Sequence, residues 1–349
     1  MPSRPEHDGR ALTRRELLQR SAVIAAGALA GPALAQWLRA GGGQRFAQAQ
    51  GVDVRGLPAE ITPNSDFYIV SKNPPGFDPD LDAALWRLEV AGRTPPLRLS
   101  YRELVALPSV QRYHTLECIS NEVGGNLISN AKWRGVPLRA ILEMAGADTS
   151  TRKLAFRCAD GYSTAILMRD ALQPDTLLAY EMNDERLPFK HGFPARLLVG
   201  GLYGMKNPKW ITRIEPVDHF LGYWEQRDWS DEAVVKTMSK FTTPNSGAIL
   251  PPGQPTQLGG VAYAGKRGVR AVEYSLDDGR TWLPAAIRSV LGPHTWVLWA
   301  VEWAPPGPGS YLLRVRAQDG TGEWQTPDEA PTLPDGASGL QRIRVYARA

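Results

Sequence analysis

The sequence predicts an α+β protein in which a mixed domain of short strands and a few helices is followed by an all-β sandwich. Its 349 residues are enough for two domains with sizeable cores. The 34 glycines and 29 prolines indicate many turns, which favours strands over long helices. A third observation is a shift to Pro, Gly and Thr at residues 246–260, beyond which the hydrophobic pattern is that of strands alone.

The mixed domain is predicted to contain an early strand and two short helices. Residues 85–90 roughly alternate apolar and polar side chains, as a strand does. Ser100 followed by Glu103 is typical of a capping box that opens a helix. A second helix is predicted over residues 137–144, with a proline in its first turn and Gly146 at its end.

The second domain is predicted to be an immunoglobulin-like sandwich. Val272, Tyr274 and Leu276 share one face of a strand that Asp-Asp-Gly at 277–279 turns back. Residues 311–317 alternate in the same way, and strands at this spacing favour a sandwich of roughly 100 residues. We therefore expect a first domain at residues 61–243 and a second at 244–349.

The N-terminus is predicted to be an export signal. Arg14-Arg15 precedes a short apolar stretch that ends in Ala-Leu-Ala at 33–35, the pattern of a twin-arginine signal with its cleavage site. The alternative is an amphipathic surface helix. We expect residues 1–35 to be this signal, residues 36–60 to be a linker, and the mature protein to be periplasmic in a bacterium. Because this route carries folded proteins, it favours an enzyme that is loaded with a cofactor before export.

The charge balance and the hydropathy exclude two classes of partner. The chain has 40 basic and 36 acidic residues, and removing the five arginines and three acids of the signal leaves a formal charge of about +2. Without a basic tract, nucleic acid is not an expected partner. No later apolar run is long enough for a membrane span, so none is expected after signal removal.

Two cysteines are present, and Cys118 lies in the first chemically dense segment. Residues 113–122 predict a strand that runs into Cys118 and then a polar turn, which places a thiol at the mouth of a sheet. A thiolate there is a soft ligand for a transition metal or a strong nucleophile, whereas the alternative is a buried free cysteine. It could also pair with Cys158 in an oxidising compartment. In a cysteine hydrolase the base would be His114, four residues away on the same face of the strand.

The second dense segment, residues 191–210, combines cationic side chains with glycines. It contains His191, Arg196, Lys206 and Lys209. An arginine fork, lysine point charges and glycine-rich backbone N–H groups together suit a phosphate or pyrophosphate. The alternative is a solvated basic loop.

Together the two segments resemble the molybdenum-cofactor domain of the sulfite oxidase family. The motifs that carry the resemblance are Thr-Leu-Glu-Cys at 115–118, Ala-Lys-Trp-Arg-Gly at 131–135, Leu-Ala-Tyr-Glu-Met-Asn at 178–183, His-Gly-Phe-Pro-Ala-Arg at 191–196 and Gly-Met-Lys-Asn-Pro-Lys-Trp at 204–210. The likeness extends from about residue 64 through the sandwich, which resembles the family's dimerisation domain.

The resemblance implies a sulfite-oxidase-type mixed α/β molybdopterin domain that holds a molybdenum–molybdopterin cofactor. It implies that Cys118 is the protein ligand to the metal, alongside the pterin dithiolene and oxo groups, and that the protein is a homodimer. The implied cofactor-binding residues are Tyr68, Ser71, Cys118, Cys158, His191, Arg196, Lys206, Asn207 and Lys209. Cys158 falls where relatives place a small polar residue near the cofactor, and a plain core position is an equal alternative. The protein's part is then to orient the cofactor and set its electrostatics.

Departures from the family pattern concern the substrate. Val123 stands where sulfite oxidases carry an arginine, the segment 71–73 lacks a second arginine, and Trp229 replaces the active-site tyrosine after an Arg-Asp pair. Two lost arginines remove charge-assisted hydrogen bonds of roughly 2–3 kcal/mol each. Lys72, Arg134 or Trp229 could substitute, and we take Cys118 and Trp229 as the catalytic candidates. Sulfite is therefore a doubtful substrate, although the family is retained.

The predicted function is periplasmic oxygen-atom transfer on a small, sulfur-containing substrate. The sequence has no Cys-x-x-Cys-His haem motif, so a separate carrier, a cytochrome or a quinol-linked protein, is expected to exchange the electrons. Two alternatives stay open: a sulfoxide reductase of the same family, and a metal-free binding protein on this fold.

Overall fold

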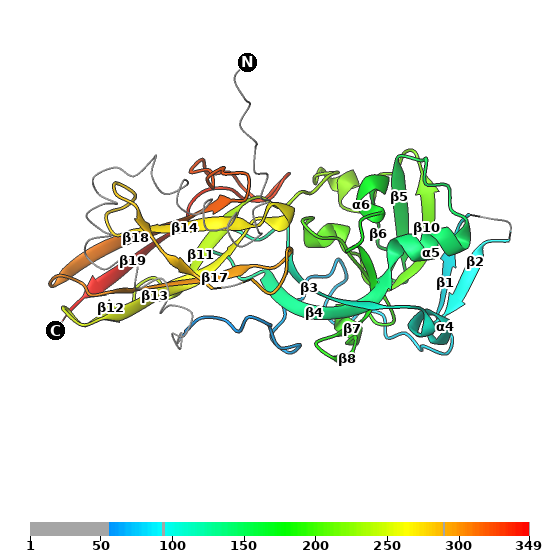
Figure 1. The fold of residues 1–349 in the computed structure, drawn as a ribbon, viewed down its shortest axis with the longest axis horizontal. Helices are drawn as coiled ribbons and strands as arrows, with labels where there is room; N and C mark the ends of the chain where they lie inside the picture. The colour runs from blue at the N-terminus through cyan, green and yellow to red at the C-terminus, as the bar shows by residue number, and fades with distance from the viewer. Residues whose placement is uncertain (1–55, 93–94, 289, 349) are drawn as a thin grey trace, which may run out of the picture. The chain divides into compact units, whose positions relative to one another are not determined.

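The computed structural model describes residues 56–92, 95–288 and 290–348, and the predicted signal peptide lies outside them together with most of the predicted linker. Among the described residues the strands form four sheets and the helices are short. Figure 1 shows the mixed domain in cyan and green and the sandwich strands in yellow to red. The predicted fold class is confirmed.

The first sheet of the mixed domain has five strands. Their order is β2 (Leu97–Ser100), β1 (Arg87–Val90), β10 (Ile211–Val217), β5 (Lys153–Cys158) and β6 (Ser163–Leu167). The β1–β10 pair is parallel and the other pairs are antiparallel. The domain's helices are α4 (Tyr101–Ala106), α5 (Leu138–Ala145) and the single turn α6 (Met168–Ala171).

The helix ends follow the local sequence signals. The Ser100 side chain accepts from the Glu103 amide while the Glu103 carboxylate accepts from the Ser100 amide, which confirms the capping box of α4. Gly146 ends α5 in the left-handed conformation that a glycine adopts without steric cost. Pro137 lies just before α5, at its N-cap, rather than inside its first turn.

The second sheet carries the strand that leads to Cys118. Its order is β3 (Val110–Glu117), β4 (Ile128–Pro137), β7 (Leu177–Met182) and β8 (Glu185–Arg186), with β9 (Arg196–Leu198) also pairing with β7. Glu117 is opposite Ile128, so the ten residues between them form the loop that joins the two strands. The predicted strand before Cys118 is confirmed, and the thiol lies where that strand ends.

The sandwich contains two sheets, in which every described strand pair is antiparallel except the β12–β19 pair. One has the order β11 (Met238–Thr243), β13 (Thr256–Tyr263), β17 (Val297–Trp303) and β16 (Ala286–Ile287); the other has the order β12 (Ile249–Leu250), β19 (Arg342–Ala347), β18 (Gly309–Asp319), β14 (Val269–Ser275) and β15 (Leu283–Pro284). A cluster around Trp299, Leu313 and Val345 fills the space between them. Since β11 pairs with β13, the sandwich begins near residue 238, before the boundary that composition predicted.

Buried hydrogen bonds at Thr115 connect the end of β3 to the sandwich. Its amide donates to the His294 carbonyl (2.9 Å), its hydroxyl accepts from the Trp296 amide (2.8 Å), and its carbonyl accepts from the Tyr263 hydroxyl (3.2 Å). The strand that positions the Cys118 thiol is therefore supported from both domains.

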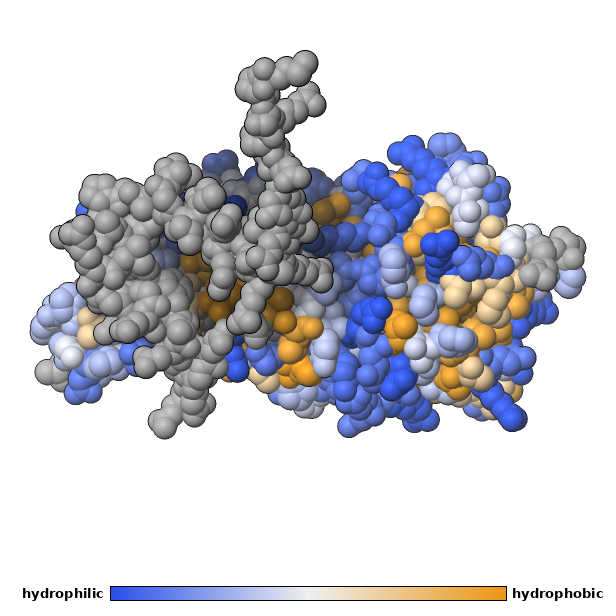
Figure 2. All heavy atoms as spheres, viewed as in Figure 1, coloured by the Kyte–Doolittle hydropathy of each residue, from blue (hydrophilic) through white to orange (hydrophobic). Residues whose placement is uncertain are grey.

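The face drawn in Figure 2 is hydrophilic over much of the described surface, and apolar residues gather in several places on it. Within residues 56–348, excluding the undescribed positions, no helix has the length and apolar character needed to cross a membrane.

Candidate functional site

A cavity of about 280 Å³ brings the two dense segments of the sequence together. Its walls come from residues 67–72, from Cys118–Ser120 after β3, from residues 204–205 and 207–210, and from Trp224 and Trp229. Pockets of this kind, mostly apolar with a few convergent polar groups, are where small ligands and cofactors bind.

The Cys118 thiol lies in the wall of this cavity and is free, as is the Cys158 thiol. Its Sγ is 3.0 Å from the Ser120 hydroxyl, and its amide donates to the Leu127 carbonyl (2.9 Å). Burial, with a contribution from the neighbouring Glu117 carboxylate, raises the pKa of the Cys118 thiol above its ordinary value. A thiol without a cation beside it is held in its neutral form until an electrophile or metal binds it.

Gly204 provides a close approach at this end of the cavity. A β-carbon on Gly204 would lie 2.8 Å from the Tyr68 hydroxyl and 3.9 Å from the Cys118 α-carbon. The predicted residue Tyr68 therefore lies beside Gly204, near the backbone of Cys118, in a space that only a glycine leaves open.

Another part of the lining is cationic. Arg196 is buried and its two terminal nitrogens donate to the carbonyls of His191 and Asn207 (both 3.1 Å). Its Nε is buried without a partner in the structure. Lys209 donates to the Lys190 carbonyl (3.0 Å). Gly192 lies in the narrow space between Arg196 and Lys209. A β-carbon on Gly192 would be 2.9 Å from the Lys209 β-carbon and 3.1 Å from the Arg196 β-carbon.

The charge states of these groups follow from burial. Burial, then repulsion from Arg196, lowers the pKa of His191 to about 4, so the imidazole is neutral at physiological pH. Its Nε2 is 3.2 Å from the Asn64 carbonyl, which accepts only if Nε2 carries the proton. Burial and Arg196 also lower the pKa of Lys209 to about 8. This part of the cavity therefore has one permanent positive charge, on Arg196, and one that is lost as the pH rises through about 8, on Lys209.

Asn207 and Ser71 line the cavity as predicted, but their side chains are already engaged. The Asn207 amide accepts from the Val199 amide (2.7 Å) and donates to two carbonyls, so it shapes the loop rather than offering a free group. The Ser71 hydroxyl donates to Asp78 (2.6 Å).

Two predicted cofactor contacts are not in the lining. Lys206 is fully buried, and its ammonium is directed to the Glu225 carboxylate and the Ala165 carbonyl instead of the cavity. Cys158 ends β5 inside the main core cluster of the first domain, which is the alternative that the sequence left open for it. The sequence predicted a direct cofactor contact for Lys206, whereas in the structure the buried Glu225 carboxylate draws its charge away from the cavity.

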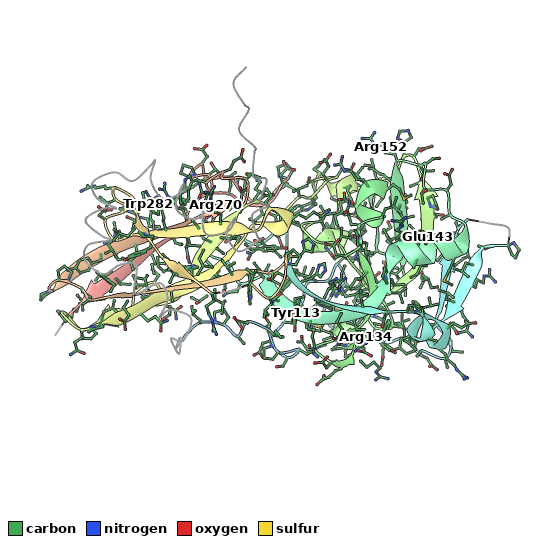
Figure 3. The ribbon with its side chains drawn as sticks, in the orientation of Figure 1. Tyr113, Arg134, Glu143, Arg152, Arg270 and Trp282 are labelled. Atoms are coloured by element: carbon green, nitrogen blue, oxygen red, sulfur yellow. The ribbon has the colours of Figure 1, made fainter. Side chains whose placement is uncertain are left out.

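The residues proposed to replace the missing arginines separate into two groups. Lys72 and Trp229 line the cavity, and the Lys72 ammonium is 5.4 Å from the centroid of the Tyr223 ring. Arg134 lies on β4 at the edge of the mixed domain (Figure 3), and it forms an ion pair with Glu181 of β7 (2.7 Å). Val123 is 41% exposed and outside the lining.

His114 does not serve Cys118 as a base. Its ring is 1% exposed, has no hydrogen-bond partner, and lies against the His294 ring with 5.1 Å between centroids. Burial and His294 lower its pKa to about 3. Cys118 lies one residue beyond the end of β3, so the alternation that predicted a shared face does not extend to it.

Several lining residues were not predicted from the sequence. Asp160 and Tyr162 follow β5 through a turn at Gly161, and Trp224 joins Trp229 from the segment after β10. The turn after β5 was a usable signal, since loops at strand ends commonly carry functional groups. No signal in the sequence distinguished Trp224 from the other tryptophans of the chain, which has 11 in all.

These residues fit a cofactor with a soft-metal end and an anionic end. The thiol supplies a sulfur ligand, while the unpartnered Arg196 Nε and the adjacent Lys209 call for an anionic acceptor. A molybdopterin, with its metal at one end and its phosphate at the other, meets both requirements within one cavity.

Comparisons with known proteins agree with the site. Residues 76–224 match the family described as oxidoreductase molybdopterin binding domain. Sulfite oxidase of Gallus gallus is 31% identical over an alignment of 325 positions, gaps included, and the alignment covers 78% of this chain and 69% of that protein. The sulfane dehydrogenase SoxCD of Paracoccus pantotrophus has the same fold, with a TM-score of 0.66, 24% identity and 76% of each chain covered.

A shorter match is to the putative protein-methionine-sulfoxide reductase subunit YedZ1 of Azospira oryzae, 36% identical over 153 residues, or 43% of this chain and 56% of that protein. The chain spans only about half the length of several other curated relatives, including 55% of human mitochondrial sulfite oxidase. The identity and coverage of the Gallus gallus enzyme, together with the matched domain, establish the family: the chain is a molybdopterin-binding oxidoreductase and belongs to the sulfite oxidase family.

Proposed function

We propose that this protein transfers an oxygen atom to or from a small, uncharged sulfur compound, using a molybdenum–molybdopterin cofactor bound in the 280 Å³ cavity. The observation that carries the proposal is the arrangement of that cavity, with the Cys118 thiol in one part of its wall and Arg196 and Lys209 in another. In this proposal Cys118 is the protein ligand to the metal. Arg196, Lys209 and the backbone near Gly192 hold the anionic end of the pterin.

The division of labour follows from the chemistry of each group. When bound, the molybdenum centre supplies the two-electron change that oxygen transfer requires. Arg196 and Lys209 neutralise the cofactor's phosphate, and neutral His191 accepts or donates a hydrogen bond without adding charge. Trp224 and Trp229 exclude water beside the thiol and present flat apolar faces to the substrate.

An uncharged substrate is favoured by the thiol end of the cavity. The neighbouring Glu117 carboxyl contributes to the raised pKa of the Cys118 thiol, and burial raises the pKa of that carboxyl itself to about 7. The single arginine in the described lining is Arg196, whose terminal nitrogens are already bonded to carbonyls. The other cations of the lining are Lys72, Lys190 and Lys209, which are point charges and not planar forks of donors. A sulfite dianion would lose its water there without gaining a fork of donors, whereas a neutral thioether or sulfoxide loses far less.

Sulfoxide reduction is the second candidate function, and the same observation favours it. A sulfoxide is uncharged and carries one strongly accepting oxygen, which matches a wall formed by the Trp224 and Trp229 side chains. The similarity to a protein described as a putative methionine-sulfoxide reductase subunit adds weight to this direction of transfer.

The remaining parts of the proposal rest on the sequence. The twin-arginine pattern at residues 13–35 supports export to a bacterial periplasm. A separate cytochrome or quinol-linked protein would exchange the electrons, and the C-terminal sandwich would form a homodimer. Fractionation of the expressing cell, and sedimentation of the purified protein, test the location and the oligomeric state.

A turnover screen of molybdenum-loaded protein tests the main proposal. We expect about one molybdenum per chain, and turnover of dimethyl sulfoxide or methionine sulfoxide with a reduced viologen, or oxidation of a thioether with ferricyanide. Sulfite should be a poor substrate by comparison. Preferred turnover of sulfite would contradict the uncharged-substrate proposal, and metal-free protein from a host competent in cofactor synthesis would contradict the enzyme itself.

The affinity of the cofactor-free protein for pyrophosphate is expected to fall as pH rises above 8. Lys209 has a pKa of about 8, so at pH 9 only about a tenth of it is charged, and affinity should fall up to about tenfold between pH 7 and 9. Titration calorimetry measures this change. Lys209→Arg is the control, since arginine stays charged and should flatten the dependence.

Stability should change with pH in the opposite direction. The folded pKa of Lys209 lies below its unfolded value, so the unfolded chain binds more protons between about pH 8 and 10.5. This group therefore makes the cofactor-free protein more stable as pH rises through that window. A parallel fall of stability and pyrophosphate affinity would show that a different group controls the binding.

A further inference from the structure

The segment 220–231, here called the wall segment, brings Trp224 and Trp229 to the cavity but contains little regular structure. Its one regular element is the 3₁₀ helix Glu225–Arg227, and its backbone hydrogen bonds are mostly local, such as that from the Trp229 amide to the Trp224 carbonyl (3.2 Å). The Tyr223 amide also donates to the Ser163 carbonyl (2.8 Å) and the Ser230 amide to the Pro334 carbonyl (3.0 Å), so the part between these two bonds depends on side chains to hold its conformation.

Lys206 holds the centre of the wall segment from outside the cavity. Its ammonium forms an ion pair with Glu225 and donates to the Ala165 carbonyl (2.9 Å). The same carboxylate oxygen of Glu225 accepts from the Thr164 hydroxyl (2.7 Å). The Lys206 and Glu225 side chains are 0% and 1% exposed, so the pair is closed to water.

Lys153 holds both ends of the same segment. Its ammonium donates to the Phe220 carbonyl (3.3 Å) and to the Asp231 carboxylate (2.6 Å). The Lys206 ammonium is 3.8 Å from Asp231, so the two lysines and two acids form one network. The wall segment is thereby fixed at its start, its centre and its end.

We propose that Lys206 is a positioning residue that sets substrate recognition through Glu225, by holding Trp224 and Trp229 in place at the cavity. The proposal rests on the proposed function of that cavity. Glu225 follows Trp224 directly, so a shift of its carboxylate moves the indole beside it. Without Lys206, the buried carboxylate must take up a proton or move towards water, because an unpaired charge is too costly at that depth. Either change loosens the wall.

The experiment is the Lys206→Met variant of the molybdenum-loaded, full-length protein. Methionine keeps much of the length and removes the charge. We expect molybdenum to stay at about one per chain, KM for the sulfoxide or thioether that the wild type turns over to rise about tenfold or more, and kcat to change far less, the pattern of lost substrate contacts. Hydrogen exchange of the peptide spanning the wall segment should become faster.

Matched variants separate positioning from general loss of stability. Arg267→Met breaks another ion pair, to the buried Asp319 in the sandwich, away from the cavity lining. It should lower the thermal midpoint without raising KM. Lys206→Arg keeps the charge and should restore much of the wild-type KM. If Lys206→Met fails to fold, Glu225→Gln provides the same test, because it removes the ion pair and keeps a hydrogen-bonding side chain.

Two results would overturn the inference. Loss of molybdenum from Lys206→Met, with unchanged exchange in the wall segment, would make Lys206 a cofactor contact. Unchanged KM and unchanged exchange would show that the ion pair does not control the wall. A wild-type protein without molybdenum would instead refute the proposed function, and the exchange measurement would still report on the wall segment.

Discussion

Cys118→Ser is expected to abolish turnover in protein that is otherwise folded. Serine replaces a soft thiolate by a hard, weakly acidic hydroxyl, which is a poor ligand for the metal. Loss of an outer-shell partner of a metal ligand typically costs 10–100-fold, so removal of the ligand itself should cost more than about 100-fold in kcat. The absorption bands from sulfur-to-metal charge transfer should change with it. The fold should persist, because Ser120 already offers a hydroxyl partner at that position.

Cys158→Ser is the matched control for this result. Cys158 is equally a free, buried cysteine, but it lies in the core of the first domain and not in the cavity lining. Burying a hydroxyl there should lower the thermal midpoint while molybdenum content and turnover per molybdenum persist. If the two variants lose activity equally, Cys118 is not the metal ligand.

Arg196→Met is expected to leave the cavity without bound cofactor. Arg196 is the one fixed positive charge buried in that wall, and its Nε has no partner within the described protein. A hydrogen bond to a charged group contributes about 1.5–3 kcal/mol, and the lost long-range attraction adds to it. We expect molybdenum content to fall from about one per chain to below about a tenth. Metal analysis of purified protein measures this directly.

The same substitution also affects the fold, so a control is needed. Removing Arg196 leaves the His191 and Asn207 carbonyls without a donor, at about 1–3 kcal/mol for each buried group. Content should therefore be measured well below the thermal midpoint. Arg134→Met removes an arginine of the partly exposed pair with Glu181, and it should keep its molybdenum. A full complement in Arg196→Met would place the anionic end of the cofactor elsewhere.

Local signals in the sequence predicted the parts of the fold that neighbouring residues decide. Ser100 and Glu103 lie in one turn and cap each other, and Gly146 ends a helix because it alone adopts the left-handed conformation cheaply. The strand before Cys118 and the alternation of β14 and β18 were likewise visible as periodicity. The sandwich boundary was not, because β11 precedes the segment where the composition changes and joins the sandwich only by pairing with β13.

For the site, the sequence determined which residue types are present and in which order, and this was enough to predict the cofactor class. The tertiary structure decided which of them face the cavity. Lys206 and Lys209 belong to the same motif, three residues apart, yet only Lys209 lines the cavity. Lys206 turns away because Glu225 and the Ala165 carbonyl, 19 and 41 residues distant, offer its charge buried partners. A motif records spacing along the chain, whereas the direction of a long charged side chain is set by whichever partner the fold brings near it, and only the folded chain shows that partner.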